Sequence, residues 1–195
     1  LHLSLRRQRQ MCIRDRYAMI PAATNTRKRR EIKSGRQDGR GKEIERIIGR
    51  SLRTAIDFSA LGEYTITLDC DVIDADGGTR TTAINGAWVA TALALKKLAN
   101  ETGVDSFNHV LIHQIGAISA GIKNEDIYID LDYEEDSSID ADCNIVINEN
   151  KDIVDIQATS EQKSFTNDIL SKLIHLSSES IEEIFIAQRK ILEEK

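Results

Sequence analysis

An alternating segment, a pair of glycines and a long apolar segment follow one another within residues 64–100, and this order constrains the fold more than any other feature of the chain. In "YTITLDCDV", residues 64–72, apolar or aromatic side chains alternate with polar ones, as in a half-buried strand. In residues 81–100, apolar side chains recur at helical spacing. Thr81 and Thr82 are candidates for the N-cap of that helix. The sequence therefore predicts a strand, a glycine-rich loop and a long helix in direct succession.

The remaining segments show the same two periods. Helical spacing predicts helices over residues 42–56 and from Thr166 to near the C-terminus. Strands are predicted at residues 109–122, 126–133, 143–150 and 153–160, with an acidic turn at 134–142. This order indicates an α+β fold in which helices pack on a mixed β-sheet. Residues 1–16 show neither period, so we interpret them as an unrelated or disordered leader before a single domain at residues 17–195.

Charge is divided unevenly along the chain, whose net charge is −6. Residues 1–56 carry 16 basic and 5 acidic side chains, whereas residues 57–195 carry 10 and 27. The basic stretch at 26–42 is typical of a surface that contacts a nucleic-acid backbone, and equally typical of a solvated charged surface. The chain has three cysteines without a C-x-x-C pair, and no apolar run of about 18 residues. These features predict a reduced, cytoplasmic protein with neither a zinc site nor a membrane partner.

The loop "DADGGTR", residues 74–80, is the first candidate for a functional site. Gly77 and Gly78 allow the main chain to approach a ligand closely. The first N–H groups of the following helix, together with Arg80, can donate to an anion. An ordinary strand-to-helix turn uses the same residue types, so the residues alone leave both interpretations open.

The acidic segment at residues 125–155 is the second candidate, with 12 Asp or Glu and one Lys. Crowded carboxylates raise one another's pKa unless a cation is present, which favours a divalent-metal site. The spacing does not fit an EF-hand, and a solvated acidic turn accounts for the composition equally well.

Taken together, these segments resemble the ribonuclease PH family of phosphorolytic tRNA nucleotidyltransferases. The resemblance is carried by "YAMIPAATNTRKRRE", "GRGKEIERIIGRSLRTAIDFSALGEYTITLDCDVIDADGGTRTTAINGAWVA", "DLDYEEDSSIDADCNIVI" and "VDIQATSE". It extends from Tyr17 to nearly the C-terminus and implies the βαβ fold of that family. Because family members have several strands ahead of the position of Tyr17, the resemblance also implies that residues 1–16 are a foreign leader and that the first strands of the fold are missing.

The resemblance implies the site residues position by position. The residues that match the family's phosphate-binding positions are Arg40, Gly78, Thr79 and Arg80. Asp136 and Asp142 match the carboxylates that take part in catalysis and bind a divalent metal. Arg27 and Arg30 match basic positions that contact RNA, whereas Ala22 stands where the family commonly has arginine.

These matches imply an enzyme that trims the 3′ ends of tRNA precursors. Inorganic phosphate would act as co-substrate, Mg²⁺ as cofactor, and a nucleoside diphosphate would be released. The implied partners are tRNA and other RNA, including rRNA precursors, and further copies of the chain in a hexameric ring. Two alternatives belong to other classes: a ring subunit that binds RNA without catalysis, and a metal-binding protein with no RNA role.

Overall fold

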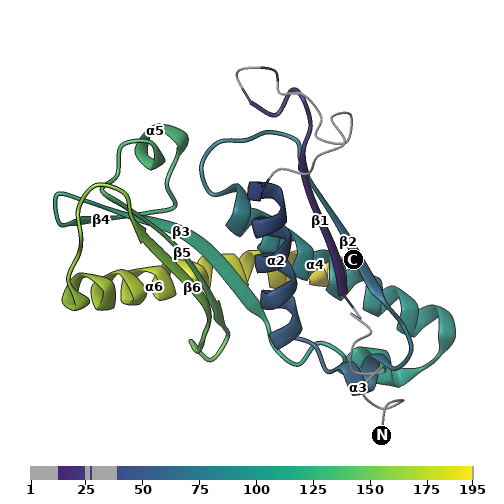
Figure 1. Ribbon diagram of the computed structural model, residues 1–195. Coiled ribbons are helices and arrows are strands. Elements are labelled where there is room, and N and C mark those ends of the chain that lie inside the picture. Colours follow the sequence, from purple (N-terminus) through teal and green to yellow (C-terminus); the bar gives the residue numbers. More distant parts are fainter. Residues whose placement is uncertain (1–12, 25–26, 28–38, 195) are drawn as a thin grey trace, which may run out of the picture.

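The computed structural model describes residues 13–24, 27 and 39–194 of the chain (Figure 1). The strands are β1 (Ile13–Met19), β2 (Ile66–Val72), β3 (Ile115–Lys123), β4 (Asp126–Ile129), β5 (Ala141–Asn148) and β6 (Ile153–Ser160). The helices are α2 (Gly39–Thr54), α3 (Phe58–Leu61), α4 (Thr79–Thr102), α5 (Tyr133–Asp136) and α6 (Asn167–Glu193), with a short 3-10 helix, η2, at Asp105–His109. The predicted α+β class is confirmed.

The strands form two sheets within the described part of the chain. β1 and β2 pair in parallel, with Ile13 opposite Ile66 and Met19 opposite Val72. The other strands form an antiparallel sheet in the order β4–β3–β5–β6. Parallel and antiparallel pairing are both present, as a mixed sheet requires, but the described residues place them in separate sheets.

β1 begins inside the segment that the sequence analysis assigned to a leader. Ile13 is 1% exposed and Tyr17 is 8% exposed, and both belong to the core that α2 and α4 help to form. The three residues between Ile13 and Tyr17 are all charged, so the sequence shows no alternation of apolar and polar side chains in this strand. Residues 13–16 therefore belong to a strand of the folded domain rather than to the leader, whose remaining residues, 1–12, lie outside the described residues.

β3 is covered by helices on both faces, and every residue of it except Lys123 is buried. Ala117 packs in the core that contains α2 and α4. The alternate residues Ile118, Ala120 and Ile122 pack in a second core with α6, which runs along one side of the antiparallel sheet (Figure 1). A strand that is buried on both faces reads as a nearly continuous apolar run, which is why "IGAISAGI" lacks a clear alternation.

Asn85 of α4 holds the helix against the open edge of β3. Its side-chain Nδ2 donates to Ala117 O at 2.8 Å, and its Oδ1 accepts from Ala117 N at 2.8 Å. β4 pairs with β3 only from Ala120 onward, so Asn85 takes the place of a neighbouring strand at Ala117. Trp88, one turn further along α4, donates from Nε1 to His113 O at 2.9 Å. These bonds fix the N-terminal half of α4 over the sheet.

Asp15 is a partly buried carboxyl group in the parallel sheet. Burial raises its pKa from 3.8 to about 6, although the Arg53 guanidinium opposes the shift. Its Oδ1 is buried and has no hydrogen-bond partner among the described residues. Because the pKa in the folded state lies above the unfolded value, the associated stability is complete below pH 3.8 and is lost as the pH rises through about 6.

We therefore expect Asp15→Asn to raise the free energy of unfolding at pH 7 by about 1 kcal/mol, a value discounted from the full shift because the carboxyl is only half-buried. Below pH 3.8, where Asp15 is protonated in both states, the gain should vanish. Thermal unfolding across this pH range measures the effect. The control is Asp69→Asn, which changes an exposed carboxylate on the adjacent strand. An equal gain at all pH values would contradict the assigned cause.

Candidate active site

The loop before α4 ends at a glycine in the left-handed region. Gly78 is the N-cap of α4 with φ +64°, a conformation that glycine adopts at little cost. A Cβ on Gly77 would lie 1.7 Å from Leu131 O, so the loop passes directly against the segment before α5. The predicted N-caps, Thr81 and Thr82, are wrong because both lie inside the helix, where Thr81 Oγ1 donates to Gly78 O at 2.8 Å. No described side chain caps α4, so its first N–H groups are open to an external acceptor.

Arg80 of this helix start lies beside Asp142 of the acidic segment. Arg80 Nη1 is 3.7 Å from Asp142 Oδ2, and each side chain is 23% exposed. Asp142 lies in β5, opposite Gly121 of β3. Burial raises the pKa of Asp142 above its ordinary value; the Arg80 charge opposes this shift, and the Asp136 carboxylate adds to it. The two candidate sites that the sequence suggested separately therefore form one site.

Arg40 contributes a second guanidinium group from a different helix. It is exposed at the start of α2, and its charge lowers the pKa of both Tyr17 and Asp142. The Arg40 charge therefore acts on the same two groups as the Arg80 charge does. Of the phosphate-binding residues expected from the sequence, Gly78, Thr79 and Arg80 lie at the N-terminus of α4, whereas Arg40 lies at the start of α2. The N-terminus of α4 offers cationic and N–H donors to an anion.

Two polar residues of this site were not predicted from the sequence. The Tyr17 hydroxyl donates to Thr79 Oγ1 at 2.9 Å across 62 positions of the chain. Ser119 of β3 is 4% exposed, and its Oγ has no hydrogen-bond partner among the described residues. A Cβ on Gly78 would lie 3.1 Å from Ser119 Oγ, so this buried hydroxyl lies directly against the loop. Neither residue has a local motif that could have indicated its role, because only the fold brings them to the loop.

Several carboxylates of the acidic segment stabilise the local structure. Asp132 is the N-cap of α5 and forms a capping box with Glu135, so the predicted acidic turn begins with a helix. Asp140 accepts from Asn124 N at 2.9 Å and lies 3.4 Å from Lys163 Nζ. The D-x-x-E spacing of the capping box was the signal in the sequence that could have indicated α5.

The Asp136 carboxylate acts on Asp142, because its charge adds to the rise in the pKa of Asp142. The described residues contain no group of three or more His, Cys, Asp or Glu placed to hold a metal ion. A two-carboxylate set nevertheless fits Mg²⁺, which commonly binds through one or two carboxylates and takes its other ligands from water and substrate phosphate. A cation bound there would offset the repulsion that Asp142 experiences from the Asp136 carboxylate.

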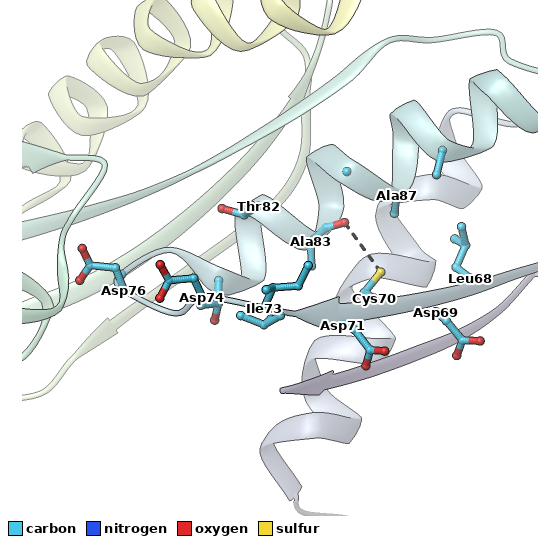
Figure 2. Close-up of a pocket in the computed structure, with 15 residues that line it drawn as sticks. Leu68, Asp69, Cys70, Asp71, Ile73, Asp74, Asp76, Thr82, Ala83 and Ala87 are labelled. Carbon is cyan, nitrogen blue, oxygen red and sulfur yellow. Dashed lines mark hydrogen bonds between the residues drawn. The ribbon is translucent and has the colours of Figure 1, made fainter. Parts of the chain in front are cut away.

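A cavity of about 520 Å³ lies between β2 and α4, and Thr79 is among the residues that line it. Figure 2 shows Leu68 and Cys70 pointing toward α4, whereas Asp69 and Asp71 point away from it. Carboxylates line the cavity along β2 and the loop, at Asp69, Asp71, Asp74 and Asp76. This negative lining disfavours a phosphate or an RNA backbone inside the cavity itself.

The two arginines expected to contact RNA are placed only in part. Arg27 is exposed, and Arg30 lies outside the described residues. Among the described helices, none is long and apolar enough to cross a membrane.

Comparison with known families gives two adjoining matches. Residues 6–97 match the model for the 3′ exoribonuclease family, domain 1, and residues 113–180 match the model for domain 2 of the same family. A curated protein named ribonuclease PH from Caulobacter vibrioides (strain NA1000 / CB15N) is 53% identical over 173 residues, which is 89% of this chain and 72% of the relative. The protein of the same name from strain ATCC 19089 / CIP 103742 / CB 15 has the same identity and coverage.

Three solved structures share the fold. Rice (Oryza sativa) Rrp46 has a TM-score of 0.69 at 16% identity, covering 93% of this chain and 73% of its own. The Archaeoglobus fulgidus exosome with RNA bound to the active site has a TM-score of 0.69 at 17% identity, covering 90% of this chain and 70% of its own. An archaeal exosome core has a TM-score of 0.66 at 17% identity, covering 91% and 68%. At these identities the comparison supports the fold alone.

Proposed function

This chain belongs to the 3′ exoribonuclease family, and from its likeness to ribonuclease PH we propose that it trims the 3′ ends of tRNA precursors with inorganic phosphate. It is a phosphorolytic 3′-to-5′ exoribonuclease, which makes it a phosphate-dependent nucleotidyltransferase. The observation that best supports this function at the candidate site is the Arg80–Asp142 pair at the N-terminus of α4. This pair joins a residue suited to hold an anion to a carboxylate suited to the chemistry of phosphoryl transfer.

The residues around α4 would position the attacking phosphate. Arg40, Arg80, the Thr79 hydroxyl and the first N–H groups of α4 orient it toward the phosphorus of the last 3′ linkage. A new oxygen–phosphorus bond forms, the bond from that phosphorus to the 3′ oxygen of the preceding nucleotide breaks, and the proton from phosphate passes to that 3′ oxygen. The products are a nucleoside diphosphate and an RNA that is one nucleotide shorter. Arg80 stabilises the negative charge of the transition state. The reaction needs no nucleophilic side chain from the protein, because phosphate itself attacks.

We further propose that Asp136 and Asp142 hold Mg²⁺. Bound there, the ion would supply charge neutralisation for the phosphoryl oxygens and the leaving oxygen. Arg80 favours the ionised form of Asp142, because its charge opposes the rise in the pKa of that carboxyl group.

The partners are proposed on the same basis. We propose that Arg27 and Arg30 contact the RNA backbone, and that the chain works as one subunit of a hexameric ring in the cytoplasm, on tRNA and rRNA precursors. The support for assembly is that two of the solved structures with this fold are exosomes. A ring subunit that binds RNA without catalysis has less support, because Arg40, Arg80, Asp136 and Asp142 are all present.

The test of this function is an assay on a tRNA that carries extra 3′ nucleotides. With phosphate and Mg²⁺, we expect nucleoside diphosphates and a ladder of shortened tRNA, and without phosphate we expect neither. Release of nucleoside monophosphates in the absence of phosphate would show hydrolysis and contradict the proposal. RNA binding without release of any nucleotide would favour the non-catalytic subunit instead.

A further inference from the structure

Tyr17 connects the parallel sheet to the start of α4. Its ring lies in the core with α2 and α4 and is 8% exposed, and its hydroxyl donates to Thr79 Oγ1 at 2.9 Å. Its backbone N–H donates to Glu45 Oε1 of α2 at 3.3 Å. The residue is therefore held at both ends, and its hydroxyl has a fixed place beneath the first residue of α4.

The bond from Tyr17 determines which way the Thr79 hydroxyl can donate. A hydroxyl group has one proton to donate and two lone pairs that accept. Because Thr79 Oγ1 accepts from Tyr17, its own proton is free to point elsewhere, and no described residue accepts it. Arg80 follows Thr79 in the chain, and the charges of Arg80 and Arg40 both act on the Tyr17 hydroxyl, which favours an anion as the acceptor.

Tyr17 remains a neutral donor in this environment. Burial raises the pKa of Tyr17 above 10.0, and the charges of Arg40 and Arg80 only partly oppose that rise. The hydroxyl therefore keeps its proton throughout the neutral range, and the direction of the bond to Thr79 does not change with pH there.

We propose that Tyr17 is a positioning residue for phosphate: its hydroxyl orients Thr79 so that the Thr79 proton points at the phosphate that occupies the N-terminus of α4. This inference rests on the proposed function, because it assumes that the same anion site serves phosphorolysis. It extends the site beyond the loop to a strand that lies 62 positions earlier in the chain.

Tyr17→Phe tests the proposal because it removes the hydroxyl and keeps the ring in the core. We expect the Kd for inorganic phosphate, measured by calorimetry without RNA, to rise about fivefold to tenfold, as for the loss of one hydrogen bond. In the phosphorolysis assay, the KM for phosphate should rise by the same factor, while the Kd for tRNA stays within about twofold of the parent. The matched control is Tyr64→Phe, which removes the hydroxyl of a half-exposed tyrosine outside the site.

A double variant separates positioning from a general loss of structure. Thr79→Val should weaken phosphate binding by itself, and adding Tyr17→Phe should cause little further loss, because the two hydroxyls act as one unit. Losses that multiply in the double variant, a parent-like Kd for phosphate in Tyr17→Phe, or equal losses of phosphate and tRNA affinity would each overturn the proposal. If the parent binds phosphate without releasing diphosphates, and Tyr17→Phe weakens that binding, the inference holds and only the proposed function fails.

Discussion

Replacing Arg80 with alanine is expected to raise the KM for phosphate about 30-fold or more and to leave the Kd for tRNA within about twofold, because a charge-assisted contact to phosphate contributes on the order of 2 kcal/mol. Two effects act in the same direction. The variant loses the guanidinium that would contact phosphate, and it also leaves Asp142 without its cation. An unpaired carboxylate then lies beside the anion site and repels phosphate.

The measurement is the rate of diphosphate release as a function of phosphate concentration, together with tRNA binding by the same preparation. Arg50→Ala is the matched control, because Arg50 also pairs with a carboxylate, Asp155, at 3.0 Å but outside the site. An Arg80→Ala enzyme with the parent's phosphate dependence would refute the placement of phosphate at the start of α4.

The second large effect is expected for Asp142→Asn, which should lower kcat by about 100-fold or more while tRNA affinity stays close to the parent's, because the lost charge acts on the transition state. The pH dependence should change as well. Since burial raises the pKa of Asp142, the parent should lose activity as the pH falls through that raised pKa and the carboxylate becomes protonated. The asparagine variant lacks this group, so its residual activity should lack that decline.

Single-turnover rates across a Mg²⁺ titration and a pH series measure both effects. Asp155→Asn serves as the control, because it neutralises the carboxylate of the Arg50 pair on the adjacent strand β6. Parent-like turnover of Asp142→Asn at every Mg²⁺ concentration would move the metal site away from Asp142. The neighbouring carboxylates Asp132 and Asp140 are poor substitutes, since the first caps α5 and the second is held by Asn124 and Lys163.

The helices and strands with a clear apolar period were predictable from the sequence. The errors concern the ends of elements, which tertiary contacts determine. The strand predicted over 64–72 corresponds to β2, and the helix predicted over 81–100 corresponds to α4. The start of α4 was misplaced because the left-handed Gly78 begins the helix earlier than a threonine cap would. The strand predicted over 109–122 begins only at Ile115, because Val110 and Ile112 form backbone hydrogen bonds with Asp57 and Ala55 instead.

The candidate site was predictable only as two parts. The glycine loop and the acidic segment each have a local composition that suggests a ligand, but neither indicates that Arg80 meets Asp142, 62 positions later. No such local composition surrounds Tyr17 or Ser119, and nothing in the sequence distinguishes them from other tyrosine and serine residues of a protein core. Their contribution depends on the pairing of β1 with β2 and on the packing of α4 over β3.

The bonds of Asn85 to Ala117 also bear on how copies of this chain can associate. A strand edge with free N–H and C=O groups invites a strand from another molecule to pair with it, which leads to aggregation. At Ala117, both backbone groups are already engaged by a side chain that belongs to a packed helix. Asn85 thus leaves no free backbone group at Ala117 with which a strand from another copy of the chain could pair.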